Sequence, residues 1–222
     1  MVSEAVDLSA AANSTINTAL AKVTLSHFDV FTGDFEEAHV LLESALAISA
    51  EINHLDYNAL SLHGLAMLAG LEGDYDDALQ LCEQIKPLFD SPDNTLSLFS
   101  WVEAVVSCGL ADYQATRRHL ALFLEKQIES RYFVRETMGL SIAAILHRQT
   151  GDLSGAAELL GLAFTHPMSA TGWMERWELL TQFRVDLEAD LGSDAYHAAW
   201  ERGTALDLET TVAGLMEEFT NE

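Results

Sequence analysis

The sequence contains little cysteine, little proline and no long apolar run. Its two cysteines, Cys82 and Cys108, form no C-x-x-C pair and are too few for a disulfide framework, so we interpret both as buried apolar residues. Only three prolines occur, and with 49% apolar and 21% charged residues the composition is that of a globular rather than a disordered chain. The apolar runs all end well short of about 18 residues, so we expect no membrane span.

Positive charge is also scarce. Eleven Lys and Arg residues stand against 35 Asp and Glu, a net charge of −24. Because neutralising phosphates with Lys and Arg supplies most of the affinity for nucleic acids, this balance argues against direct nucleic-acid binding. Five of the basic residues cluster within one stretch: Arg117, Arg118, Lys126, Arg131 and Arg135. This basic cluster either receives an anionic partner or balances the protein's own acidic surface.

The usual signatures of chemistry are missing. There is no G-x-x-x-x-G-K-[ST], no G-x-G-x-x-G and no G-x-S-x-G, and none of the eight histidines forms an H-x-x-x-H or H-E-x-x-H pair. We therefore expect no cofactor, no metal site and no enzymatic activity. The acidic N-terminus has neither the basic start nor the apolar core of a signal peptide, which predicts a cytoplasmic protein.

One phrase occurs four times at nearly constant spacing. It begins at Gly33, Gly73, Ala111 and Gly151 and reads G-D-F-E-E-A, G-D-Y-D-D-A, A-D-Y-Q-A-T and G-D-L-S-G-A. Self-similarity at a period of 20–50 residues is typical of repeat architectures. The glycine suits the left-handed position that ends one helix, and the aspartate suits the N-cap of the next. Each phrase therefore predicts the turn of a helical hairpin.

Small residues share the same register. The positions seven residues before each turn and five residues after it are all small: Ser26, Ala66, Ala104, Ala144, Ala38, Ala78, Thr116 and Ala156. Two helices approach closely only where neither carries a bulky side chain, so these positions predict the helix crossings. Nine residues after the turn come Leu42, Leu120 and Leu160, with Cys82 as the exception. These larger side chains should fill the groove beside each crossing.

The turn and the small crossing residues resemble the tetratricopeptide repeat family over roughly residues 13–165. The family's tryptophan and repeat-ending proline are mostly missing, and the period of 38–40 exceeds the family's usual 34. The resemblance implies an all-α fold: a right-handed α-solenoid of four antiparallel hairpins over residues 1–168. It also implies a concave groove lined by the first helix of each hairpin. By register, its inward positions are His27, His63, Met67, Trp101, Val105, Ile145 and Arg148. These residues either line a groove for a peptide or small ligand or belong to the core. For Trp101 and His63 we expect the core first.

The tail resembles the C-terminal end of large bacterial ATP-binding regulators, in which a LuxR-type activator or a nucleotide cyclase is fused to an ATPase and a helical repeat array. The matching residues are Leu191, Gly192, Tyr196, Ala199, Trp200, Gly203, Leu206, Leu208, Glu209 and Val212. This resemblance implies a helical region of a bacterial transcription or signalling system.

The periodicity predicts helix pairs near 14–31 with 34–50, 55–71 with 74–89, 95–109 with 112–128, and 132–149 with 152–164. Further helices are predicted near 173–190, 194–203 and 207–219. Because the end of a solenoid must cover an apolar face, we interpret residues 169–222 as a cap of the same continuous solenoid. Its aromatic residues Trp173, Trp177, Phe183, Tyr196 and Trp200 then form a packed core, with an exposed docking patch as the alternative. Leu187, Leu191, Leu208, Val212 and Leu215 should be mostly buried with them.

Two functions follow as hypotheses. The first is a non-catalytic interaction or scaffold module that holds a protein or peptide in the concave groove. The second is a small-molecule effector-sensing domain, by analogy with the repeat region of the maltose-system activator. An enzyme with its site inside the superhelix is a third, weaker hypothesis.

Overall fold

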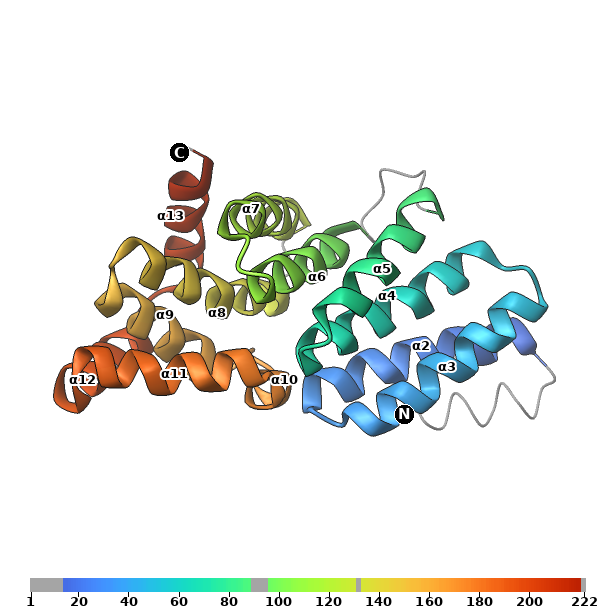
Figure 1. The fold of residues 1–222 in the computed structure, drawn as a ribbon, viewed down its shortest axis with the longest axis horizontal. Helices are drawn as coiled ribbons and strands as arrows, with labels where there is room; N and C mark the ends of the chain where they lie inside the picture. The colour runs from blue at the N-terminus through green and yellow to red at the C-terminus, as the bar shows by residue number, and fades with distance from the viewer. Residues whose placement is uncertain (1–13, 89–95, 131–132, 221–222) are drawn as a thin grey trace. The chain divides into compact units, whose positions relative to one another are not determined.

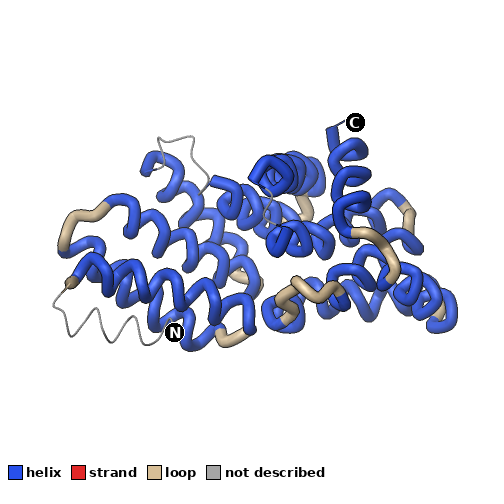
Figure 2. Tube along the Cα trace, turned by 180° about the vertical axis from the view of Figure 1, so that it is seen from behind, coloured by secondary structure: helices blue, strands red, loops and turns tan. Residues whose placement is uncertain are grey.

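Every regular element in the described part of the chain is a helix. The computed structural model describes residues 14–88, 96–130 and 133–220, in which twelve α-helices and one short 3₁₀ turn occur and no strand is present (Figure 2). Short loops join most of the helices. The all-α class expected from the sequence is therefore confirmed. None of the described helices is long and apolar enough to cross a membrane.

The chain divides into two compact units, Met1–Asp93 and Asn94–Glu222. The first unit contains α2 (Thr15–Thr32), α3 (Phe35–Glu51), α4 (Leu55–Glu72) and α5 (Tyr75–Ile85), followed by the 3₁₀ turn Lys86–Leu88 (Figure 1). Helix α2 packs against α3, and α4 packs against α5. These are the first two predicted hairpins.

The second unit contains the other two predicted hairpins and the C-terminal helices. The hairpins are α6 (Leu96–Gly109) with α7 (Tyr113–Ser130), and α8 (Phe133–Thr150) with α9 (Leu153–Thr165). The remaining helices are α10 (Gly172–Arg176), α11 (Glu178–Leu191), α12 (Ser193–Thr204) and α13 (Leu208–Thr220). Helix α12 packs on α9, and α13 packs on α7 and α8.

The four hairpin turns have the same backbone geometry. Gly33, Gly73 and Gly151 adopt φ values of 90°, 92° and 88°, and Ala111 stands in the same left-handed region at 58°. In each turn the N–H of the following aspartate donates to a carbonyl five residues back, as in Asp34 to Asp29 at 2.8 Å. This is the Schellman motif, which satisfies carbonyls that the helix end leaves open. The predicted stop of each first helix is confirmed.

The aspartate after each turn caps the next helix in only two of the four hairpins. Asp112 and Asp152 each accept a backbone N–H three residues ahead, from Ala115 and Gly155, both at 2.9 Å. Asp34 and Asp74 make no such bond, and Asp34 instead accepts from the Thr32 hydroxyl at 2.7 Å. The uniform capping expected from the sequence is thus wrong for the first unit.

The small residues lie where the register requires. All eight predicted crossing positions have no exposed surface: Ser26, Ala38, Ala66, Ala78, Ala104, Thr116, Ala144 and Ala156. The larger residues nine positions after the turn are equally buried. Leu42 of α3 lies directly against Gly64 of α4, and Leu120 of α7 lies against Gly139 of α8. A glycine in the following hairpin therefore receives each of these two leucines.

The C-terminal helices bury the apolar positions expected of them. Leu187, Tyr196, Leu208, Val212 and Leu215 are buried, while Leu191 and Trp200 are half-buried. Helices α9 and α12 meet through glycine, because a Cβ on Gly203 would overlap the carbonyl oxygen of Glu158 and one on Gly161 that of Trp200. Because glycine has no side chain, these two helices can approach closely.

The single helix predicted near 173–190 is wrong. Helix α10 ends at Arg176, and Trp177 adopts an extended conformation (φ −73°, ψ 103°) before α11 begins. Trp173 and Trp177 therefore do not share one helix face. The break allows both indoles to be buried at once, with ring centroids 6.1 Å apart.

Candidate functional site

The predicted groove positions of the first unit lie on α2 and α4. The imidazole rings of His27 and His63 stack with centroids 5.8 Å apart and an interplanar angle of 28°. Nδ1 of His27 lies 2.8 Å from the carbonyl oxygen of Val23, so His27 donates to its own helix. His63 and Met67 are buried, and His27 is half-buried. Of the three, only His27 offers substantial surface.

Three groove positions of the second unit belong to its core. Trp101, Val105 and Ile145 are buried, and the indole N–H of Trp101 donates to the carbonyl oxygen of Met138 at 3.1 Å. Trp173 of α10 meets Trp101 edge to face, with centroids 5.0 Å apart and an interplanar angle of 88°. Helix α10 thus packs its largest side chain, Trp173, against Trp101 of α6.

The fourth position, Arg148, is engaged by α11. Its guanidinium lies 2.6 Å from Asp190 and 3.8 Å from Asp186, and it stands over the ring of Phe183 with 5.9 Å between the Cζ atom and the centroid. Arg148 and Trp101 both contact the C-terminal helices of the same chain. In the second unit, therefore, α10 and α11 occupy the surroundings of these two predicted groove residues.

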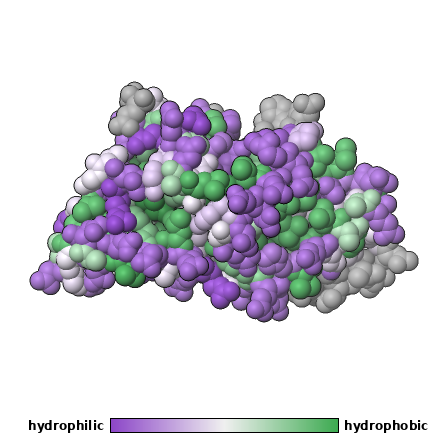
Figure 3. All heavy atoms as spheres, in the orientation of Figure 1, coloured by the Kyte–Doolittle hydropathy of each residue, from purple (hydrophilic) through white to green (hydrophobic). Residues whose placement is uncertain are grey.

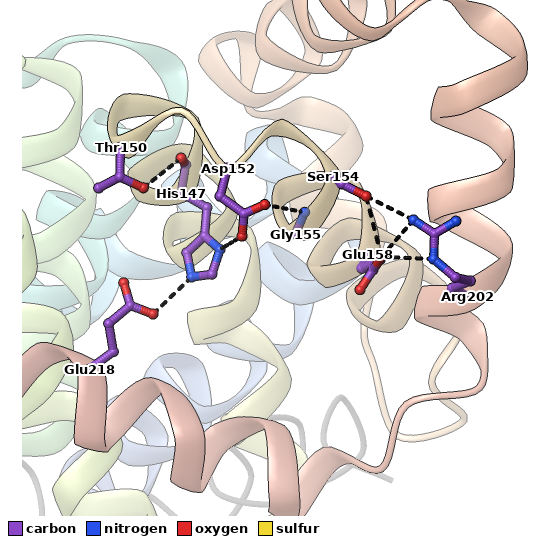
Figure 4. A network of polar contacts seen from close by, with 8 residues as sticks. All are labelled: His147, Thr150, Asp152, Ser154, Gly155, Glu158, Arg202 and Glu218. Atoms are coloured by element: carbon purple, nitrogen blue, oxygen red, sulfur yellow. Dashed lines mark hydrogen bonds and ion pairs between the residues drawn. The ribbon is translucent and has the colours of Figure 1, made fainter.

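Polar contacts tie the last hairpin to the helices that follow it (Figure 4). His147 of α8 stands between two carboxylates, with Asp152 at 3.0 Å from Nδ1 and Glu218 of α13 at 3.1 Å from Nε2. Arg202 of α12 contacts Glu158 at 2.7 Å and donates to the Ser154 hydroxyl at 2.7 Å. These groups hold α12 and α13 against the hairpin.

The basic cluster is partly used inside the second unit. The guanidinium of Arg117 lies over the ring of Phe219 in α13, 5.4 Å from its centroid. Arg118 is exposed and Lys126 half-buried. Arg131 and the side chain of Arg135 lie outside the described residues. Arg117 therefore contributes to packing as well as to surface charge.

Most aromatic residues of the C-terminal segment are buried, and a second arginine lies against Trp200. Trp173, Trp177, Phe183 and Tyr196 are buried. Arg184 places its guanidinium 4.4 Å from the centroid of Phe164 and 5.5 Å from that of Trp200. Such cation–π contacts attract the guanidinium to the faces of the two rings. The packed-core interpretation of this segment is confirmed, with Trp200 at its edge.

An exposed apolar face on α2 escaped the sequence reasoning. Ile16, Leu20 and Phe28 are 48%, 40% and 61% exposed. They are separated by four and eight residues, which places them along one side of the helix. The sequence contains the signal, since α2 carries apolar residues on two sides, but the spacing of the small residues indicates only the side that faces the partner helix. On the surface drawn in Figure 3, apolar side chains emerge at several places among hydrophilic ones.

Acidic groups surround the turn at the C-terminal end of α2. Partial burial raises the pKa of Asp29 above its ordinary value, and the negative charges of Asp34 and Glu37 raise it further. Residues 1–93 contain 16 Asp and Glu against two Lys and no Arg. The first unit therefore presents its exposed apolar face within a strongly negative field.

No group of three or more His, Cys, Asp or Glu side chains that could hold a metal ion is found among the described residues. Comparisons of the chain with models of protein families, with curated proteins and with solved structures each returned no match.

Proposed function

We propose that this chain is a non-catalytic protein-interaction module of the tetratricopeptide type, a right-handed α-solenoid closed by its C-terminal helices. Four turns with one backbone geometry and eight completely buried crossing positions support the repeat architecture. The resemblance of the tail to bacterial ATP-binding regulators supports a role in a cytoplasmic transcription or signalling system.

The observation that carries the interaction role is the exposed apolar face of α2. A helix whose second face shows Ile16, Leu20 and Phe28 to solvent exposes apolar side chains in a row rather than singly. Contiguous exposed apolar surface marks sites of protein interaction more often than scattered residues do. The predicted groove residues Trp101 and Arg148, by contrast, contact α10 and α11 of the same chain. We therefore assign partner binding to the first unit.

Capture followed by reconstitution tests the interaction role. The full chain is immobilised, captured proteins are identified, and each candidate is purified and mixed with the chain. We expect one candidate to form a complex of defined stoichiometry by light scattering. If no purified candidate does so, and a small metabolite raises the melting temperature instead, the chain is an effector sensor and the interaction role is wrong.

A further inference from the structure

The apolar face of α2 is continuous along the helix. Ile16, Leu20, Thr24 and Phe28 follow one another at intervals of four residues. The Thr24 hydroxyl donates to the carbonyl oxygen of Leu20 at 2.9 Å, so its polar group is satisfied within the helix. Phe31 lies half-buried one turn further along the same side. We call these five residues the α2 ridge.

The fold uses a different side of this helix. Ala19, Val23, Ser26 and Val30 are buried, and α2 packs against both α3 and α4. On a helix with 3.6 residues per turn, the α2 ridge is centred about 110° from these residues, so it forms a flank beside the packed side of the helix. A row of side chains spaced by four is also one of the two ridges by which helices pack into the grooves of other helices.

The ridge has dimensions that suit a helix as its partner. From Ile16 to Phe28 it covers thirteen residues, a rise of about 18 Å over twelve steps of about 1.5 Å. That length corresponds to three turns of a second helix, a common length for helices that bind through one apolar face. An extended strand would need an open sheet edge, and the described residues contain no strand.

The charge around the ridge selects the sign of the partner. Asp29, Asp34 and Glu37 stand at its C-terminal end, and Lys22 and Lys86 are the only Lys or Arg residues in the first 93. Lys86 already lies 2.6 Å from Glu83. A second copy of this chain would bring a further acidic surface, and like charges disfavour such a contact. A basic partner gains attraction instead.

We propose that the α2 ridge is the docking site for an amphipathic helix of a partner protein, with a row of apolar side chains flanked by Lys and Arg. The inference rests on the proposed interaction role and names its partner class. Binding buries the exposed rings and aliphatic chains of the ridge, and the acidic surroundings orient the basic flanks.

Two synthetic peptides test this assignment by fluorescence anisotropy. Both are amphipathic 18-residue helices with the same leucine face, one flanked by Lys and the other by Glu. We expect the Leu/Lys peptide to bind the full chain and to bind less tightly as salt rises. Phe28→Ser should lower its affinity by about tenfold or more, the loss typical of a large aromatic anchor. The Leu/Glu peptide should not bind.

A matched variant separates docking from general attraction to an acidic protein. Val185 of α11 is 60% exposed, close to the 61% of Phe28, and lies in the other unit. Val185→Ser should bind the Leu/Lys peptide like the unmodified chain, and circular dichroism should show both variants equally helical. Equal affinities of Phe28→Ser and Val185→Ser would mean non-specific charge attraction and would overturn the proposal.

Two further outcomes also overturn it while leaving the interaction role intact. One is self-association of the chain that Phe28→Ser abolishes, which would make a second copy the occupant of the ridge. The other is a purified partner that binds Phe28→Ser as tightly as the unmodified chain, which would place the interaction on another surface.

Discussion

At the scale of single residues, Ala78 shows how closely the hairpins pack. It has no exposed surface, and neither has Ala66 on the facing helix. Replacing Ala78 with Leu adds atoms where none fit, and overpacking of this kind costs about 1–3 kcal/mol. We expect a clear fall in melting temperature, measured by circular dichroism. Ala47→Leu, at an exposed position of α3, is the control and should melt like the unmodified chain. If Ala78→Leu does the same, the hairpin register is wrong.

Asp29 gives a pH-dependent prediction. Burial, Asp34 and Glu37 raise its pKa in the folded state, so its charged form is disfavoured there. A carboxyl with a raised folded-state pKa favours the folded state at low pH, and this contribution is lost as the pH rises through the folded-state pKa. Asp29→Asn should therefore raise the melting temperature slightly at about pH 7 and leave it unchanged at about pH 3, below the ordinary carboxyl range.

Asp56→Asn is the control for this effect, because Asp56 is exposed in the first turn of α4. It should not stabilise the protein at neutral pH. A melting temperature of Asp29→Asn that is equal to or below that of the unmodified chain at neutral pH would contradict the assigned repulsion. The backbone carbonyl of Asp29, which accepts from Asp34 in the turn, is retained in the asparagine variant.

At the scale of elements, the contact between α9 and α12 depends on glycine. A Cβ at position 203 would overlap the backbone of Glu158, and backbone does not move aside as a flexible side chain does. Gly203→Ala should therefore force the helices apart and cost about 1–3 kcal/mol, as overpacking does. Guanidinium unfolding followed by tryptophan fluorescence would measure it, because Trp200 lies on α12.

Gly214 provides the opposite case on a neighbouring helix. It stands within α13 with nothing near the position of a Cβ. Gly214→Ala should stabilise the protein by about 0.5–1 kcal/mol, because alanine loses less conformational freedom in a helix than glycine does. Opposite signs for the two glycine variants are expected, and a stabilising Gly203→Ala would show that α9 and α12 are not in close contact.

At the scale of the whole molecule, the C-terminal helices complete the second unit. Trp173 packs on Trp101, and Arg117, Arg148 and His147 contact residues of α11 and α13. Truncation after Thr165 should expose Trp101 and the apolar face of the last hairpin, so the shortened chain should aggregate or self-associate. Size-exclusion chromatography with light scattering would detect this. A monomeric truncated chain that still melts cooperatively would show that these helices are dispensable.

The sequence alone predicted the features that depend on local rules. A glycine ends three of the four first helices because the left-handed turn favours it, and Ala111 adopts that conformation in the fourth. Small residues mark each crossing because bulky ones do not fit there. The helix pairs of the four hairpins, the all-α class and the burial of the small positions followed from those rules and are confirmed, whereas the single helix predicted near 173–190 is not. The groove was not predicted from local rules, because its seven positions came from the register of a family resemblance.

Only the tertiary structure decided which side chains far apart in the sequence contact one another. No local pattern encodes the break at Trp177, the pairing of Arg148 with Asp190 or the stacking of His27 on His63, because each depends on contacts between helices. The same holds for the α2 ridge, because an apolar residue is buried or exposed according to which neighbours surround it. Hydrophobicity is a property of the residue, whereas exposure is a property of the packing.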